Sequence, residues 1–483
     1  MQFNLIRPAL IIYFALCFNI AHSKSQYQDT LTSTDDIELS VLLNVSANEI
    51  LERAEFYRVT NPKISLDYAN EEIDRATLNG DFFIQARAHS LLGDLARKSK
   101  NLKQAIHHFS TALLMYKDNN EEHHYLISSI DYTHSLLMDK QYQDAQKTIN
   151  ELLPIAIQYG DQWVIAKLYI IDADCHYQKK QYNEAIEQYS KSIKHILGDD
   201  NETQTLLGTT YKKIAQSYKR LRDREKTAFY YKKALTIFID LQNNQLIANT
   251  LNTLAEAERY LGNYLLALDY SNQSLKIHEQ LNDPVSLAKT LMGAGIIYRH
   301  IGRYEDSIKH IHQANLYYQE VNNVSGIAKT SNEMGLLYSR LKQFDQARSF
   351  YQLTIDLPET EIEPKTIASA LREMAIIDLN AQNLDNAKKH ALKALGIYTK
   401  ENDLLKRTLL SKILGNIYRA QKDTPNAVAY YTQSLSLATK ADNVLYQIKA
   451  QTPLASMLIE TNTEKAISLL KSSLALSTQI NNQ

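Results

Sequence analysis

Along most of this chain apolar residues recur with the period of an α-helix, and the same apolar pattern returns in segment after segment. In the segment that starts at Tyr182, the residues Ala185, Tyr189 and Ile193 fall on one helical face. Segments with the same pattern start at Pro62, Leu102, Tyr142, Tyr182, Arg224, Tyr264, Tyr304, Phe344, Leu384, Thr424 and Thr463. Most of these starts are 40 residues apart, which predicts eleven repeated units along the chain.

A column of small residues lies twelve positions before Ala185 and its equivalents. It consists of Gly93, Thr133, Ala173, Ala215, Ala255, Gly295, Gly335, Ala375 and Gly415. Small side chains let two helix axes approach closely, so the column predicts that each unit is a pair of packed helices. Pairs such as Asn282-Asp283 lie between the units. Asn and Asp tolerate left-handed backbone and cap helices, so these pairs predict a turn followed by the start of the next helix. The pattern predicts an all-α solenoid over residues 41–483.

Glycine is followed three residues later by tyrosine in several first helices, at Gly295 and Tyr298, Gly335 and Tyr338, and Gly415 and Tyr418. With the columns of the second helix, this step resembles the tetratricopeptide repeat family over about residues 40 to 483. The resemblance implies a right-handed superhelix of antiparallel helix pairs whose first helices line a concave groove. The family's early tryptophan and closing proline are absent, and the 40-residue period exceeds the usual period of about 34. The longer period resembles the long-helix branch that includes bacterial peptide-sensing regulators and periplasmic sensory regions.

Composition argues against a β-rich fold, and the net charge argues against nucleic acid as the partner. The 483 residues include only 13 glycines and 8 prolines, too few turn-formers for a many-stranded β-sandwich or barrel. The 53 basic and 54 acidic residues give a net charge of −1, so no global field favours nucleic acid as a partner.

The first 23 residues have the pattern of a secretory signal peptide. Arg7 precedes an apolar run from Pro8 to Ile20, and Ala21-His22-Ser23 offers small residues at the cleavage position. The run is shorter than the roughly 20 residues that span a bilayer. We therefore expect a signal peptide at residues 1–23, an N-terminal extension at residues 24–40, and export to the periplasm.

The chain lacks the common catalytic and metal-binding motifs. It contains no Gly-x-Ser-x-Gly elbow, no phosphate-binding loop with lysine and no His-Glu-x-x-His. The neighbours His107 and His108 point to different helix faces, whereas ligands on one helix are three or four residues apart. We predict a protein that is not an enzyme and has no catalytic residue, metal site or cofactor. Cys175 is interpreted as a structural thiol.

Residues that face the groove should lie six and three positions before, and one and four after, the small-residue column. This stripe is rich in basic residues, and only Asp94, Asp174 and Glu256 are acidic. The ligand-binding residues that it predicts, called the predicted stripe below, are Lys212, Lys219, Asn252, Arg259, Lys289, Arg299, Lys329, Asn332, Arg372, Lys412 and Arg419. The alternative is an ordinary solvated face whose cations are neutralised by carboxylates at helical spacing.

The last unit ends without a polar capping helix, so we expect a partner or a second copy to cover its apolar face, or the natural protein to continue beyond Gln483. The functional prediction is an exported scaffold that binds a protein or peptide, anionic and extended, in its groove. The alternative is the periplasmic sensory region of a transmembrane signalling protein, of the histidine kinase or diguanylate cyclase type.

Overall fold

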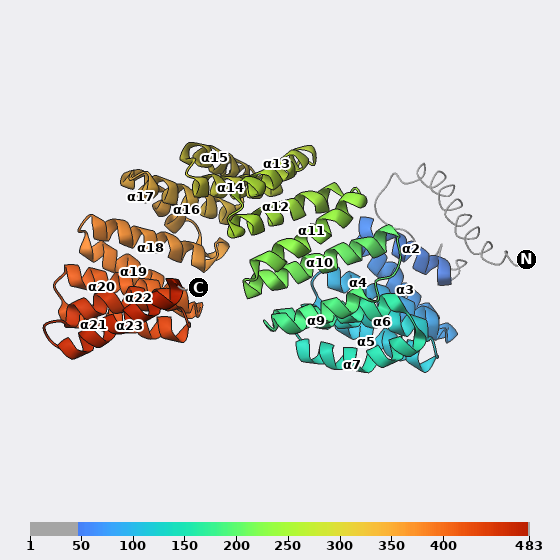
Figure 1. Cartoon of the computed structure of the whole chain (residues 1–483). Helices are drawn as coiled ribbons and strands as arrows, with labels where there is room; N and C mark the ends of the chain where they lie inside the picture. Colours follow the sequence, from blue (N-terminus) through green and yellow to red (C-terminus); the bar gives the residue numbers. More distant parts are fainter. Residues whose placement is uncertain (1–46, 482–483) are drawn as a thin grey trace, which may run out of the picture. The chain divides into compact units, whose positions relative to one another are not determined.

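A computed structural model describes residues 47–481, and its helices follow one another in antiparallel pairs (Figure 1). The first helices of the pairs are α2 (Ala47–Thr60), α4 (Phe82–Lys98), α6 (Glu122–Met138), α8 (Gln162–Gln178), α10 (Asn201–Leu221), α12 (Asn244–Leu261), α14 (Pro284–Ile301), α16 (Val324–Arg340), α18 (Pro364–Asn380), α20 (Leu404–Ala420) and α22 (Val444–Leu458). The second helices are α3 (Pro62–Asn79), α5 (Leu102–Asp118), α7 (Tyr142–Tyr159), α9 (Tyr182–Ile193), α11 (Arg224–Asp240), α13 (Tyr264–Gln280), α15 (Tyr304–Glu320), α17 (Phe344–Asp356), α19 (Leu384–Lys400), α21 (Thr424–Lys440) and α23 (Thr463–Asn481). Within the described range there is no strand, so the fold is the predicted all-α solenoid.

The repeat register read from the sequence is confirmed throughout this range. Each of the eleven second helices begins at the residue that the apolar pattern marks as its start, from Pro62 to Thr463. The predicted signal peptide and N-terminal extension, residues 1–40, lie outside the described residues. No helix among residues 47–481 combines the length and apolar character that a membrane crossing requires.

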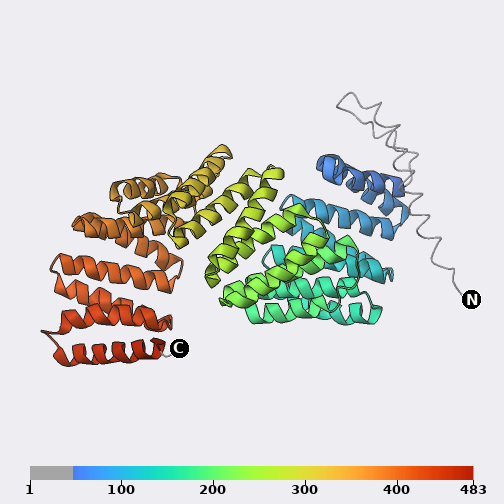
Figure 2. The same cartoon turned by 45° about the horizontal axis from the view of Figure 1, so that its top comes forward.

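The helices form two compact units that divide within α7, after Thr148. Unit 1 contains the described residues 47–148, and unit 2 contains residues 149–481. In both units consecutive helices pack on one another, as Figure 2 shows for the stacked pairs toward the C-terminus.

Neighbouring first helices also contact one another, α2 with α4 in unit 1 and α12 with α14 in unit 2, for example. The second helices pack mainly on first helices. A stack whose first helices approach one another more closely than its second helices curves toward the first helices. The first helices therefore line the inner face within each unit, as the family resemblance implies.

The column of small residues is buried at the contact between the two helices of each pair. A Cβ atom on Gly335 would lie 2.6 Å from the Tyr351 ring, and one on Gly415 would lie 2.6 Å from the Tyr431 ring. Glycine at these positions therefore lets the aromatic ring of the second helix pack directly against the backbone of the first.

The turns between units follow the predicted Asn and Asp pattern. Asn282 adopts a left-handed backbone with φ of 51°, and the side chain of Asp283 accepts a hydrogen bond from the Ser286 amide at 3.1 Å. The turns inside the pairs were not predicted. Many of them place a long basic side chain in the left-handed region, as Lys100, Lys140, Lys180, Arg222, Lys342 and Lys422 do.

Two second helices are shorter than the others. Helix α9 ends at Ile193, and the connection to α10 contains Gly198 with φ of 133°. Helix α17 ends at Asp356 before Pro358, and a short 3-10 turn, η2 (Glu359–Glu361), leads to Pro364 at the start of α18. Proline lacks the amide that an interior helical turn needs, which accounts for the early end of α17.

Candidate ligand-binding groove

A pocket of about 630 Å³ opens on the first-helix face of unit 2 and gathers four residues of the predicted stripe. Helix α10 supplies Lys219, α12 supplies Asn252 and Arg259, and α14 supplies Lys289. These helices belong to three consecutive repeats, so residues far apart in the sequence line one wall. We call this cavity the groove pocket.

The rest of the groove pocket combines charge with apolar surface. Arg220 and Glu256 add one further cation and the single carboxylate that lines the pocket. The apolar and aromatic lining consists of Tyr177, Tyr231, Met292, Ile296 and Ile297. A mainly apolar cavity with a few oriented polar groups is the usual form of a ligand site.

The cations of the groove pocket differ in how their charge is balanced. The Lys219 ammonium lies 2.6 Å from a carboxylate oxygen of Glu256. The Arg259 guanidinium instead lies over the Tyr260 ring, 4.1 Å from its centroid. No carboxylate of residues 47–481 forms an ion pair with Arg259 or Lys289. The pocket therefore keeps a surplus of positive charge.

Positive charge also surrounds the pocket. Burial, followed by the nearby Lys289 ammonium, lowers the pKa of Lys212. Burial and the guanidinium groups of Arg299, Arg259 and Arg340 lower the pKa of His300. Burial is the larger cause of both shifts, and the neighbouring cations add a repulsion that a bound anion would relieve.

Arg299 is partly neutralised. Its Nε atom lies 3.3 Å from a carboxylate oxygen of Glu333 on the next first helix, α16. Burial raises the pKa of Glu333, although Arg299 and Arg259 act in the opposite direction. Removing Arg299 would leave a half-buried carboxylate without its main partner.

The predicted stripe beyond α14 lies outside the groove pocket, and neighbouring repeats engage much of it. Lys329 pairs with Glu363 at 2.8 Å, and Arg372 pairs with Glu373 through its Nε atom at 3.0 Å. The Asn332 amide donates a hydrogen bond to the Thr366 carbonyl at 2.9 Å. Carboxylates therefore neutralise Lys219, Arg299, Lys329 and Arg372, but none of these pairs has the helical spacing of three or four residues that the alternative interpretation assumed.

Two residues near the C-terminal end of the predicted stripe differ from this group. Lys412 and Arg419, both on α20, form no ion pair with any carboxylate in the described range. Burial, followed by the Lys449 ammonium, lowers the pKa of Lys412. Their part in ligand binding stays a prediction.

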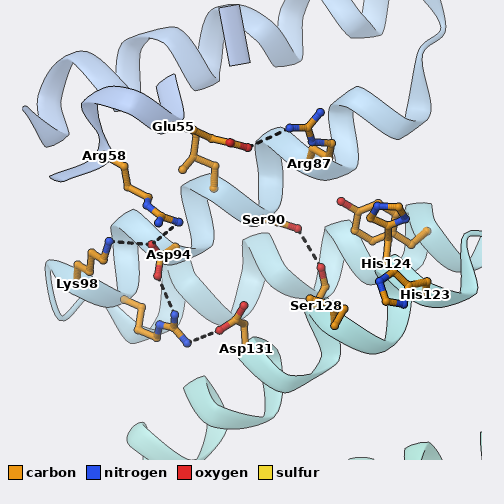
Figure 3. A pocket seen from close by; sticks show the side chains of 14 residues that line it. Glu55, Arg58, Arg87, Ser90, Asp94, Lys98, His123, His124, Ser128 and Asp131 are labelled. Carbon is orange, nitrogen blue, oxygen red and sulfur yellow. Dashed lines mark hydrogen bonds and ion pairs between the residues drawn. The ribbon is translucent and has the colours of Figure 1, made fainter. Parts of the chain in front are cut away.

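Unit 1 has a charged pocket of its own, also of about 630 Å³ (Figure 3). Helices α2, α4 and α6 supply its cations and carboxylates, and His123 and His124 at the start of α6 also line it. Arg87 pairs with Glu55 at 3.1 Å across α4 and α2. The four basic residues, Arg58, Arg87, Arg97 and Lys98, face three carboxylates, Glu55, Asp94 and Asp131.

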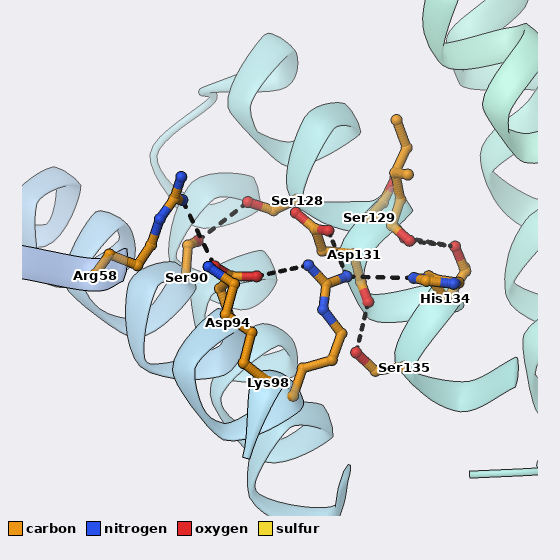
Figure 4. Close-up of polar contacts among 12 residues, drawn as sticks. Arg58, Ser90, Asp94, Lys98, Ser128, Ser129, Asp131, His134 and Ser135 are labelled. Atoms are coloured by element: carbon orange, nitrogen blue, oxygen red, sulfur yellow. Dashed lines mark hydrogen bonds and ion pairs between the residues drawn. The ribbon is translucent and has the colours of Figure 1, made fainter. Parts of the chain in front are cut away.

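Asp94 is the centre of the ionic contacts in this pocket (Figure 4). Its carboxylate lies 2.7 Å from Arg97, 3.0 Å from Lys98 and 3.6 Å from Arg58. Arg97 also pairs with Asp131 at 2.7 Å. Burial tends to raise the pKa of Asp94, but the hydrogen bonds from Arg97 and Lys98 outweigh it and the pKa is lowered. Each of the four cations in this pocket therefore has a carboxylate partner, in contrast to Arg259 and Lys289 of the groove pocket.

The histidines and the cysteine that the sequence offered as candidate reactive groups do not line the groove pocket. His89 Nδ1 and His108 Nδ1 lie 3.1 Å apart, a contact that sequence spacing missed because His89 belongs to the other helix of the pair. Across residues 47–481 no group of three or more His, Cys, Asp or Glu side chains could hold a metal ion. Cys175 is buried, and burial raises the pKa of its thiol to about 12. An inert structural thiol has these properties.

Several groove residues were absent from the sequence prediction. Tyr177 lies four positions after Ala173, where a groove-facing residue is expected, but it was not among the ligand-binding residues predicted; Tyr231 lines the groove pocket from the second helix α11. The basic residues that follow Lys219 at the turn between α10 and α11, from Arg220 to Lys226, were visible in the sequence but were not singled out. These residues lie at the helix ends, which a stripe counted from the helix centre does not reach.

Comparison with known proteins identifies the repeats. Sequence models of the tetratricopeptide repeat match residues 246–314, 286–360 and 410–445. No curated protein sequence is significantly similar to the chain.

Two solved structures have a similar fold. The apo form of RapI is 14% identical, with a TM-score of 0.58, and the match covers 74% of this chain and 98% of RapI. The apo form of the quorum sensor NprR from B. thuringiensis is 15% identical, with a TM-score of 0.51, and the match covers 75% of this chain and 99% of NprR.

Proposed function

Because this chain is a tetratricopeptide repeat protein, we propose that it is a non-enzymatic scaffold whose groove binds a protein or peptide ligand. The ligand is extended and anionic, and it lies along the first helices of unit 2. Fold similarity at 14 to 15% identity supports the architecture alone, so the ligand class rests on the groove's own residues.

The surplus of positive charge in the groove pocket carries this proposal. Four cations, Lys219, Arg220, Arg259 and Lys289, line the pocket with the single carboxylate of Glu256. These cations lie on three successive first helices, α10, α12 and α14. Acidic side chains of an extended chain would meet these cations in succession.

The neutral lining suits the rest of such a ligand. Asn252 lines the pocket, and its amide can both donate and accept hydrogen bonds with a peptide backbone. Met292, Ile296 and Ile297 offer apolar surface for side chains between the acidic ones.

The test replaces the two cations that have no carboxylate partner. Arg259→Ser with Lys289→Ser removes two charges without leaving an unpaired carboxylate. The control, Lys276→Ser with Lys309→Ser, removes the same charge from exposed positions on the second helices α13 and α15. Binding of a fluorescein-labelled, glutamate-rich peptide is followed by anisotropy.

We expect the groove variant to bind the peptide at least about tenfold more weakly, a loss of about 1.4 kcal/mol, and the control to bind as the unmodified protein does. Binding should also weaken as salt rises, because screening shortens the reach of each charge. Equal binding by both variants, or binding that is indifferent to salt, would show that the predicted stripe is an ordinary solvated face.

We also propose that the protein is exported to the periplasm. The pattern of residues 1–23 supports this location. Fractionation of cells that express the full chain, with mass spectrometry of its N-terminus, tests it. A periplasmic protein that begins at Lys24 is expected, and a cytoplasmic protein that retains residues 1–23 would contradict the proposal.

A further inference from the structure

The fifth helix pair, α10 and α11, departs from the repeat pattern at two positions. Arg224 begins α11, whereas the other second helices begin with an apolar or aromatic residue, a proline or a threonine. Thr227 occupies the column that holds alanine or serine in most other second helices, as Ala185 and Ser307 do. Both departures make the start of α11 more polar than its counterparts.

These two residues line one small pocket. It has a volume of about 310 Å³ and lies where the C-terminal ends of α10 and α12 meet the start of α11. Lys219, Arg222 and Arg224 supply three cations, and Thr227, Thr253 and Tyr260 complete the polar lining. The hydroxyls of Thr227 and Thr253 donate to the Asp223 and Thr250 carbonyls at 2.6 and 2.9 Å, so the cations are the groups that the pocket offers to a ligand. No carboxylate lines the pocket. We call this cavity the oxyanion pocket.

The aromatic ring of Tyr260 and its backbone hold the arginines in place. Arg224 Nη1 donates a hydrogen bond to the Tyr260 carbonyl at 2.8 Å, and its guanidinium lies 5.8 Å from the centroid of the Tyr260 ring. Arg259 lies over the same ring at 4.1 Å. A carbonyl and a ring orient a guanidinium but do not neutralise it, so the charge stays available to a ligand.

The carboxylates beside the oxyanion pocket are already engaged. Asp223 accepts a hydrogen bond from the Lys226 amide at 3.0 Å and pairs with the Lys226 ammonium at 3.3 Å. Glu256 pairs with Lys219 at 2.6 Å. In the described chain neither Arg222 nor Arg224 forms an ion pair with a carboxylate.

We propose that the oxyanion pocket binds a phosphate group carried by the ligand of the groove. This proposal rests on the proposed function, because the molecule that would carry the phosphate is the ligand of the groove. Lys219 and Thr253 line both pockets, so a side chain of a peptide in the groove pocket can reach the oxyanion pocket. A phosphate monoester carries nearly two charges and three acceptor oxygens, which match the two unpaired guanidinium groups of Arg222 and Arg224 better than the single charge of a carboxylate does.

The experiment compares two acidic peptides that differ only by one phosphoserine in place of serine. Their affinities are measured by fluorescence anisotropy for the full chain and for two variants, Arg222→Gly and Arg224→Gln. Glycine retains the left-handed backbone of position 222, where φ is 63°, so the first variant removes charge without backbone strain. Glutamine at position 224 keeps a donor toward the Tyr260 carbonyl.

Arg303→Gln is the matched control. Arg303 lies at the turn between α14 and α15, two repeats further on, and pairs there with Asp306 at 2.7 Å. Inorganic phosphate is added as a competitor at constant ionic strength, with chloride as the reference.

We expect the phosphorylated peptide to bind at least tenfold more tightly than its unphosphorylated form, and inorganic phosphate to remove most of that gain. Both pocket variants should lose the gain while they keep their affinity for the unphosphorylated peptide, and Arg303→Gln should retain it. Equal binding of the two peptides to the unmodified chain, or a gain that survives in both pocket variants, would overturn the phosphate pocket and leave the groove proposal intact.

If neither peptide binds, line broadening of the phosphorus resonance of inorganic phosphate by the full chain but not by Arg224→Gln supports the pocket alone. Absence of that broadening would overturn it.

Discussion

Glu72 stands in a column of the second helices that otherwise holds small or apolar residues. The equivalent positions are Ala112, Leu152, Ser192, Ala234, Ser274, Ala314, Thr354, Ala394 and Ser434. The Glu72 side chain is fully buried, and neither of its carboxylate oxygens has a hydrogen-bond partner. Burial raises the pKa of this carboxyl from 4.5 to about 7. Unit 1 therefore folds around a carboxyl group that prefers its proton.

This residue makes the stability of unit 1 depend on pH. A carboxyl whose pKa is higher in the folded state stabilises that state fully below pH 4.5, and the contribution is lost as the pH rises toward 7. We expect Glu72→Ala to remove this loss, so that the variant gains roughly 3 kcal/mol relative to the unmodified protein between pH 4 and pH 8. Urea unfolding at both pH values measures the difference. A difference in unfolding free energy that does not change with pH would refute the assignment.

The helix caps set where each element begins. Asp403 precedes α20 and accepts a hydrogen bond from the Lys406 amide at 3.1 Å, whereas Asn383 precedes α19 without such a bond. Both residues occupy the same place at the start of a helix, so the two positions form a matched pair.

We expect Asp403→Ala to lower the free energy of unfolding by about 0.5–2 kcal/mol, because an amide of the first turn loses its acceptor. Asn383→Ala should cost less, since no capping bond is broken. Thermal melts of the two variants provide the comparison. Equal losses would mean that the cap bond contributes nothing at Asp403.

At the scale of the whole molecule, most contacts join helices that follow one another in the sequence. Helix α21 packs on both α20 and α22, whereas α23 packs on α22. Helix α23 also exposes Ile467, Leu470 and Leu474. The lower number of packed faces predicts lower local stability for α23.

Hydrogen exchange should therefore be faster in α23 than in α21. The exposed apolar face also predicts self-association, which light scattering would detect as a mass that rises with concentration. Ile467→Gln with Leu474→Gln should reduce that rise, whereas Lys276→Ser with Lys309→Ser should not. A constant monomeric mass together with equal protection of α21 and α23 would contradict both expectations.

The sequence by itself determined the helical register and the pairing of helices. Each second helix begins at the predicted residue, because the apolar face and the small-residue column are properties of contacts within one unit. These contacts lie close together in the sequence, so local periodicity reports them. The predicted stripe was likewise placed on the first helices, and four of its members reached the groove pocket.

Only the tertiary structure decided which charges remain free. Lys219 meets Glu256 and Arg299 meets Glu333, in each case across two successive first helices, whereas Arg259 rests on the Tyr260 ring. Whether a cation is neutralised depends on the reach and direction of side chains between repeats. A count of charges along one helix face does not contain that information.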